Sequence, residues 1–282
     1  MTDHPKKTPS AISYFADNPI STASEDLLQR SKFVERIVHE IDMIDASQGY
    51  VMAVMGQWGS GKTSVLNLVK ERLSDSGTIL VEYNPWLLSG AEELVSGLFR
   101  EINAKLNKKG VKYRAAIDKI IDYGEILAPL TSVPVVGAWA NGVLMPFQVM
   151  AKRRNLRTTS VVEQKEQVAE ALTNIDSSIV VIVDDIDRLD KVEVREIFKL
   201  VRLTANFPNV IYLLSFDRIR VENALAEDGV PGRAYLEKIV QNGFEIPMIP
   251  KKVLTREVAQ ALDSALEQVK VRLDREVWDN TL

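Results

Sequence analysis

The chain has 282 residues, 46% of them hydrophobic and 26% charged, which suits one sizeable α/β domain with a packed core and a helical appendage. Its net charge of −4 argues against a dominant nucleic-acid-binding or anionic-membrane surface, although it does not exclude a local basic patch. The chain contains no cysteine and only two histidines, His4 and His39, so a disulfide framework and a thiolate metal site are excluded and a histidine-based centre is disfavoured.

Residues 1–24 form a predicted N-terminal arm. They are polar, are punctuated by Pro5, Pro9 and Pro19, and contain no apolar core of a secretory signal. Together with the lack of cysteine, this favours a reducing, cytoplasmic setting.

Residues 25–44 carry apolar side chains at helical spacing and predict a helix ahead of the first strand. In many nucleotide-binding domains this segment lies over the adenine, so Pro19, Ile20 and Leu27 are candidates for an apolar base pocket. The equal alternative is that these three side chains only cap the core.

A glycine-rich loop follows the first predicted strand, residues 50–55 (YVMAVM), and leads into a predicted helix, residues 64–73. Its sequence matches the phosphate-binding pattern of a glycine, four residues and then Gly-Lys-Thr. A strand, glycine loop and helix in this order place backbone N–H groups and a helix N-terminus around a phosphate chain. Lys62 is expected to reach the β- and γ-phosphates, and the Thr63 hydroxyl to hold Mg²⁺. The predicted nucleotide-binding residues are Gly56, Gln57, Trp58, Gly59, Ser60, Gly61, Lys62, Thr63 and Ser64.

Residues 78–83 (TILVEY) predict a second strand, which Asn84-Pro85-Trp86 interrupts. Residues 92–106 then predict an amphipathic helix. The basic run at residues 105–114 (KLNKKGVKYR) is most simply a solvated face, with partner binding as the alternative.

Residues 126–151 contain no charged side chain, and Lys152-Arg153-Arg154 follows at once, which is the profile of a membrane span. A single span would place the two halves of the nucleotide site on opposite sides of a bilayer. Two spans need about 40 apolar residues, more than this stretch offers. We therefore expect an apolar insertion that is buried, lies at an oligomer contact, or dips into a membrane face, which would make the protein peripheral to the inner membrane.

Residues 161–175 predict a helix, and residues 179–183 (IVVIV) predict a buried central strand. Three acids follow at its carboxyl end, where open α/β sheets bind ligands: Asp184, Asp185 and Asp187. Asp184 is expected to bind Mg²⁺ through its water shell, and Asp185 to orient or deprotonate the attacking water. Alone, these acids could equally form a solvated turn, but a complete phosphate loop in the same chain favours the catalytic interpretation.

The rest of the chain alternates between helices and strands. The predicted helices are residues 190–204, 218–225 and 232–240, the predicted strands are residues 210–215 and 244–247, and one long amphipathic helix follows Pro250 through Val277.

Polar residues after the later strands are further candidates. Asp217, or Ser215, ends the strand that is expected to neighbour the acidic one, so it could sense the γ-phosphate by hydrogen bonding. The arginine candidates for transition-state stabilisation, in this chain's site or in a neighbouring subunit's, are Arg188, Arg202, Arg218 and Arg233. Each of them could also be an ordinary salt-bridge residue.

Together these motifs resemble the KAP family of P-loop NTPases, within the larger STAND and AAA-like group. The matching stretches, between about Asp17 and Pro250, are residues 56–63 (GQWGSGKT), 83–86 (YNPW), 183–189 (VDDIDRL), 212–217 (YLLSFD), 235–241 (YLEKIVQ) and 244–247 (FEIP). The resemblance implies Mg-ATP binding and hydrolysis by a bacterial cytoplasmic or inner-membrane-associated protein, frequently with a role in excluding phages or plasmids. Family members often carry transmembrane helices between the two nucleotide motifs, and the apolar insert here is too short for a pair.

A second resemblance concerns the trans-acting cation. Pro231-Gly232-Arg233 looks like the finger-bearing turn of AAA ATPases, which makes Arg233 and Lys238 the first candidates for that role.

We therefore predict an α/β fold: a P-loop NTPase three-layer sandwich with a mostly parallel central sheet, a helical insertion and a C-terminal helix. The expected domains are the arm (residues 1–24), the NTPase domain (25–250, with a helical and apolar insertion at about 90–160) and the start of a C-terminal helical region (251–282). The expected function is Mg-dependent ATP hydrolysis by an oligomerising switch or motor with a protein effector, and nucleic-acid binding is unsupported. The alternative is a scaffold that signals by nucleotide-dependent assembly with little hydrolysis. The expected catalytic residues are Lys62, Asp185, Asp217 and Arg233.

Overall fold

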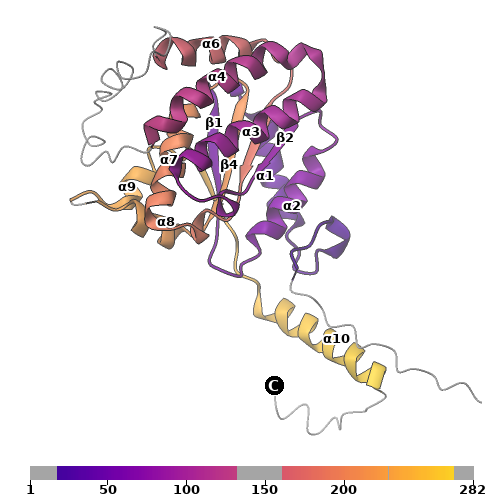
Figure 1. Ribbon diagram of the computed structural model, residues 1–282. Coiled ribbons are helices and arrows are strands. Elements are labelled where there is room, and N and C mark those ends of the chain that lie inside the picture. Colours follow the sequence, from indigo (N-terminus) through magenta and orange to yellow (C-terminus); the bar gives the residue numbers. More distant parts are fainter. Residues whose placement is uncertain (1–17, 132–160, 228, 270–282) are drawn as a thin grey trace, which may run out of the picture.

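A computed structural model of the chain describes residues 18–131, 161–227 and 229–269 (Figure 1). Its centre is a parallel sheet with the strand order β2-β3-β4-β1-β5. The inner strands β3, β4 and β1 are buried along almost their whole length, as their nearly uninterrupted apolar sequences predict. The strands are β1 (Tyr50–Met55), β2 (Ile79–Tyr83), β3 (Ile179–Val183), β4 (Val210–Phe216) and β5 (Asn242–Glu245).

Helices cover both faces of this sheet (Figure 1). α1 and α2 pack on one face with strand residues such as Met52 and Val54, and α3, α4, α6, α7 and α8 pack on the other with Val51 and Ala53. Successive side chains of a strand point to opposite faces, so both cores are built from the same strands. The predicted three-layer α/β sandwich is thereby confirmed. The helices are α1 (Ser31–Met43), α2 (Lys62–Leu73), α3 (Ala91–Lys109), α4 (Arg114–Thr131), α6 (Val161–Thr173), α7 (Lys191–Thr204), α8 (Arg218–Leu225), α9 (Gly232–Leu236) and α10 (Lys251–Val269).

The strand order determines which segments meet at the carboxyl edge of the sheet. β4 lies between β1, which leads into the glycine loop, and β3, which leads into the three acids. Met55 of β1 pairs with Phe216 of β4, and Val183 of β3 pairs with Leu214 of β4. Because the strands are parallel, the loop, the acids and the end of β4 all emerge at one edge.

The helix ahead of β1 begins at Ser31 and not at Glu25. Residues Ala23–Glu25 form a separate 3₁₀ turn, and Gln29 has a positive φ of 57°, which breaks the helical path. The Asp26 carboxylate then accepts a hydrogen bond from the Ser31 N–H at 2.9 Å and so caps the start of α1. The apolar spacing predicted a helix here but did not show where this cap lies.

Two later elements also differ in their bounds. β5 begins at Asn242 and ends at Glu245, because Met52 to Met55 of β1 supply partners for those four residues, and Pro247 has no N–H to donate. α9 ends at Leu236, earlier than the predicted 232–240.

α4 occupies part of the predicted insertion, between the basic run and the uncharged stretch 126–151. The last residues of α4 are the first of that stretch, and the remainder lies outside the described residues. Within the part of the chain that the structure describes, no helix combines the length and the apolarity that crossing a bilayer requires. The basic run forms the end of α3 and a 3₁₀ turn, Val111–Tyr113.

α10 extends away from the body of the molecule (Figure 1). Its apolar side chains Leu254 and Val258 are 48% and 55% exposed. The predicted continuation to Val277 lies outside the described residues.

One buried polar contact between α7 and β4 gives a first prediction, about stability. The Thr204 hydroxyl lies 2.7 Å from the Tyr212 hydroxyl, and Thr204 is fully buried. Burial raises the pKa of Tyr212, so its phenol stays protonated and needs a partner. Thr204→Val should therefore lower the free energy of unfolding by about 1–3 kcal/mol, the cost of an unsatisfied buried hydroxyl. Chemical denaturation measures this loss of unfolding free energy. The control is Thr173→Val on the exposed side of α6. Equal unfolding free energies for the two variants would contradict the prediction.

Candidate functional site

The glycine loop joins β1 to α2 at the carboxyl edge of the sheet. Gly59 and Gly61 have φ values of 77° and 87°, a left-handed conformation that glycine adopts without strain. At Gly56 a Cβ would come within 2.3 Å of the Ser60 hydroxyl, so a larger residue there would displace the Ser60 side chain. α2 begins at Lys62, directly after the loop, so its unpaired N–H groups face the space the loop encloses.

Ser60 gives the loop a further polar group. Its hydroxyl is buried and finds no hydrogen-bond partner among the described residues. Buried polar atoms are normally satisfied, and a phosphate oxygen bound in the loop would satisfy this one. The loop therefore fits the anion that its sequence predicts.

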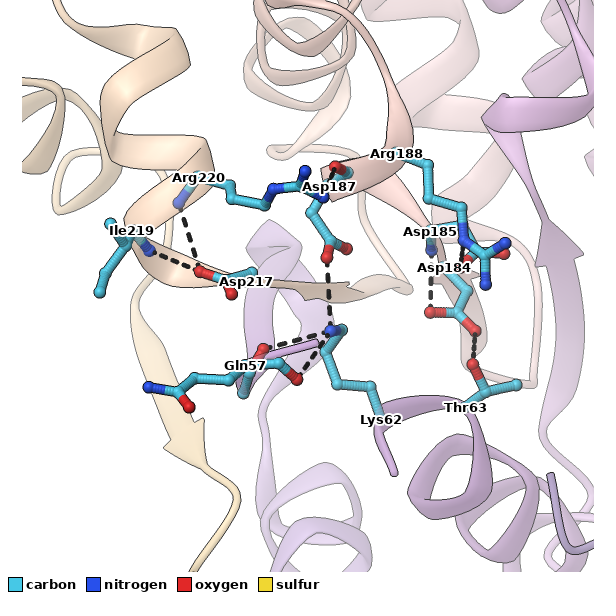
Figure 2. A network of polar contacts seen from close by, with 11 residues as sticks. Gln57, Lys62, Thr63, Asp184, Asp185, Asp187, Arg188, Asp217, Ile219 and Arg220 are labelled. Carbon is cyan, nitrogen blue, oxygen red and sulfur yellow. Dashed lines mark hydrogen bonds and ion pairs between the residues drawn. The ribbon is translucent and has the colours of Figure 1, made fainter. Parts of the chain in front are cut away.

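The predicted metal-binding pair meets directly. The Thr63 hydroxyl donates to Asp184 Oδ2 at 2.8 Å, which joins the start of α2 to the end of β3 (Figure 2). A hydroxyl and a carboxylate are the oxygen donors that Mg²⁺ prefers, and Mg²⁺ usually takes its other ligands from water and phosphate. The described residues hold no cluster of three or more acidic or histidine side chains arranged for a metal, so these two residues fit a metal bound together with a nucleotide.

Lys62 points back onto its own loop and toward the third acid. Its Nζ donates to the carbonyl oxygens of Gly56 at 3.1 Å and Gln57 at 3.4 Å. It also lies 3.4 Å from Asp187 Oδ2, and the two side chains are only 11% and 2% exposed (Figure 2). The sequence pattern singled out Asp187 as one of three acids but assigned it no role.

Each carboxylate oxygen of Asp185 has a partner. Oδ2 accepts a hydrogen bond from Asn84 Nδ2 at 2.9 Å, and Oδ1 lies 2.6 Å from Arg188 Nε. The residue has a φ of 60°, which an aspartate tolerates better than most side chains. Asn84 follows β2, so the break in the YNPW stretch supplies a side chain that reaches this acid.

Two tryptophans and two arginines stack at the mouth of the loop. The Arg188 guanidinium lies 5.0 Å from the centroid of the Trp58 ring and 5.1 Å from that of Trp86. Arg220 lies 5.7 Å from the Trp58 centroid. These are cation–π distances, and Trp58 is nonetheless 62% exposed. The stack ties the loop to the segments that follow β2 and β3 and to the start of α8.

Asp217 and Ser215 lie at the end of β4, as the order of strands requires. Asp217 Oδ1 accepts from the backbone N–H groups of Ile219 at 3.0 Å and Arg220 at 3.3 Å, so this carboxylate caps α8 (Figure 2). The Ser215 hydroxyl is buried and has no partner among the described residues. The prediction that one of them senses the γ-phosphate remains a prediction, with Asp217 already serving as a helix cap.

The remaining cation candidates lie away from this cluster of acids or are already paired. Arg218 pairs with Glu222 at 2.8 Å and Glu245 at 2.9 Å, and these contacts raise its pKa. Arg233 on α9 is an exposed side chain that pairs with Glu237 at 2.7 Å. Lys238 is exposed as well, and Arg202 is engaged with Tyr235.

A cavity of about 440 Å³ opens beside the metal-binding pair, between α2, α3 and the end of β2. Its lining includes Thr63, Asp184 and Asn84, and also Lys70 and Arg100. The candidates for a base pocket are placed differently. The Ile20 carbonyl accepts from Asn67 on α2 at 2.8 Å, Leu27 is 62% exposed and Pro19 is exposed, so adenine contact by these residues stays a prediction.

Comparison with known proteins gives one family and several relatives. The model of the KAP family P-loop domain matches residues 30–282. A phage T7 exclusion protein of Escherichia coli (strain K12) is 28% identical in an alignment 281 residues long that covers 90% of this chain and 37% of that protein. The chain thus spans little more than a third of that relative.

Solved structures give more distant matches. A Walker-type ATPase of Pyrococcus abyssi is 12% identical over 92% of this chain and 63% of that chain, with a TM-score of 0.45. Cdc6p from Pyrobaculum aerophilum is 15% identical over 90% of this chain and 51% of that chain, with a TM-score of 0.43.

Proposed function

Because the chain belongs to the KAP family of P-loop domains, we propose that it binds ATP with Mg²⁺ at residues 56–63 and hydrolyses it. The observation that carries this proposal is the 2.8 Å hydrogen bond from Thr63 to Asp184, which lies 121 positions later in the sequence. Two polar side chains so far apart have no local reason to meet at the loop. Both side chains would contact a metal-bound triphosphate, which explains why they lie together.

The loop and the start of α2 would bind the phosphate chain. Backbone N–H groups and the Ser60 hydroxyl donate to phosphate oxygens, and the Lys62 ammonium neutralises the β- and γ-phosphates. Thr63 and Asp184 would hold Mg²⁺, the latter through water, and the ion supplies positive charge where the transition state gathers negative charge.

Asp185 is the residue proposed to orient the attacking water. Each of its oxygens has one partner and a further lone pair for water, so the contacts with Asn84 and Arg188 fix the direction in which the carboxylate meets the water. Asn84 and Arg188 are therefore positioning residues that act through Asp185. Hydrolysis then depends on whether they hold the carboxylate toward the attacking water in the nucleotide-bound protein.

The same two contacts favour a second candidate function. If Asn84 and Arg188 hold the Asp185 carboxylate away from the attacking water in the nucleotide-bound protein, the chain is a scaffold that binds ATP and assembles but hardly hydrolyses it. In either case, the exposed Arg233 and Lys238 are placed to meet a neighbouring molecule and are our candidates for a cation that acts in trans.

We also propose a biological setting. The E. coli relative carries the name of a phage exclusion protein, and we infer that this chain serves a similar defence, as an oligomerising switch with a protein effector.

Thr63→Val tests the role of the metal. The variant keeps the shape of the side chain and removes the hydroxyl that contacts Asp184. We expect Mg²⁺ to increase the ATP affinity of the unchanged protein. In the variant, the ATP affinity in the presence of Mg²⁺ should be about 10- to 100-fold lower, the usual cost of losing a group at a metal site. ATP affinity in the presence of a chelator should be equal in the two proteins.

The control is Thr255→Val on the exposed surface of α10, which should behave as the unchanged protein. The measurements are calorimetric ATP titration with and without Mg²⁺, phosphate release, and solution mass with and without ATP. Release of phosphate supports the ATPase, and ATP-driven assembly without release supports the scaffold. Mg²⁺-independent ATP binding by the unchanged protein would refute the metal-holding role of Thr63 and Asp184, and failure to bind ATP would defeat both functions.

A further inference from the structure

Asp187 is a buried acid at the site that the proposed chemistry does not use. It lies in the 3₁₀ turn Ile186–Arg188 directly after the two acids with proposed roles. Its side chain is 2% exposed, and its Oδ2 lies 3.4 Å from Lys62 Nζ. A carboxylate is this deeply buried only when a charge or hydrogen bonds compensate it, and the loop lysine is the compensating charge seen here.

The Lys62 ammonium has three oxygen neighbours in this arrangement. They are the carbonyl oxygens of Gly56 and Gln57, which accept hydrogen bonds from Nζ, and the carboxylate of Asp187, which forms an ion pair with it. A phosphate that approaches this ammonium competes with these oxygens. Of the three, Asp187 alone carries a full negative charge and therefore competes most strongly with the phosphate.

Arg220 is placed to compensate Asp187 when Lys62 leaves. Its Nη1 donates to the Asp187 backbone carbonyl at 3.2 Å, and Figure 2 shows Lys62 and Arg220 approaching Asp187 from different sides. The same guanidinium lies against the Trp58 ring of the loop. A small movement of Arg220 from the carbonyl to the carboxylate would keep Asp187 paired and would change the surroundings of Trp58.

We propose that Asp187 sets the nucleotide affinity of the site by holding Lys62 in the empty protein, and that nucleotide binding transfers Asp187 from Lys62 to Arg220. This inference rests on the proposed binding of ATP but not on its hydrolysis. Asp187 acts as an internal competitor for the position that the phosphate takes, and Arg220 lowers the cost of releasing it.

Two variants should shift the affinity in opposite directions. Asp187→Asn keeps the size of the side chain and removes the competing charge, so it should bind ADP and a non-hydrolysable ATP analogue about 10-fold more tightly. Arg220→Gln removes the cation that pairs with Asp187 after Lys62 leaves, so this variant should bind both nucleotides about 3- to 10-fold more weakly.

Asp190→Asn is the matched control. It neutralises an exposed carboxylate three positions from Asp187, where the side chain caps α7 by accepting from the N–H groups of Val192 and Glu193 at 2.8 Å each. Asparagine caps a helix as well as aspartate does, so this variant should fold and bind as the unchanged protein. If it tightens binding as much as Asp187→Asn, a general charge effect explains the result and the inference is wrong.

The readouts are calorimetric dissociation constants for the full chain and the tryptophan fluorescence change on adding ADP in a Trp86→Phe background. Equal or weaker nucleotide binding by folded Asp187→Asn overturns the inference. Unchanged nucleotide binding by Arg220→Gln overturns it as well. The Arg220→Gln variant alone tests the inference if Asp187→Asn does not fold. Failure of the unchanged protein to bind any nucleotide would instead refute the proposed function.

Discussion

Asp185→Asn should reduce phosphate release by about 100- to 10,000-fold, the usual contribution of a general base, while ATP stays bound. Asparagine tolerates the left-handed backbone at this position, so the fold should be unaffected. It cannot accept a proton from the attacking water, and its NH₂ group must face one of the two donors that now hold the carboxylate, Asn84 and Arg188. Loss of release with unchanged ATP affinity would identify Asp185 as the group that acts on water.

Asn84→Ala is the informative companion to that variant. It removes one of the two contacts that hold Asp185 and leaves the carboxylate intact. A faster release than in the unchanged protein would show that Asn84 restrains the acid, and a slower one that it orients the acid. If neither the unchanged protein nor Asn84→Ala releases phosphate, the hydrolysis proposal fails and the scaffold remains.

Lys62→Ala should weaken ATP binding by at least about 30-fold, because close charge pairs at binding sites are commonly worth more than about 2 kcal/mol. The ammonium would be the protein's own positive charge on the β- and γ-phosphates, and removing it also leaves Asp187 buried without its partner. The fold should therefore lose some stability, which circular dichroism and thermal unfolding would quantify beside the calorimetric titration.

The matched control for Lys62→Ala is Lys105→Ala on α3. Lys105 forms a partly exposed pair with Glu82 at 3.8 Å, and such surface pairs contribute little. Its ATP affinity should equal that of the unchanged protein. An ATP affinity of Lys62→Ala within about threefold of the control would place the phosphate chain away from the loop and would contradict the proposed site.

Much of the fold was predictable because its signals are local. The apolar runs of β1, β3 and β4 are buried strands at nearly the predicted bounds, and the glycine pattern before Lys62 predicted the loop. The start of α1 was predicted wrongly because Gln29 breaks the helix without any change in the apolar spacing. α4 was not foreseen as an element of its own, since its apolar face continues into an uncharged stretch that hides the helical period.

The parts of the site that belong to sequence motifs could be predicted. The contacts between single side chains from different strand ends could not. Thr63 and Asp184 belong to recognisable motifs, so their meeting could be expected. The contacts of Asn84 with Asp185, of Asp187 with Lys62 and of Arg220 with Asp187 join residues that are far apart in sequence. The stretches that contain Asn84 and Asp187 are recognisable, but their sequence does not show which side chains meet, because these contacts follow from the strand order and from side-chain directions at one edge of the sheet.

β4, the strand between β1 and β3, determines how far apart the glycine loop and the acids lie. Strands lie about 4.8 Å apart, so the loop and the acids start from anchors separated by on the order of 10 Å. β4 lies between them and sets this distance. Its buried residues therefore affect the geometry of the site without contacting a nucleotide. Backbone hydrogen bonds of the sheet hold this spacing, so a substitution that distorted β4 would change the distance between the loop and the acids without touching either of them.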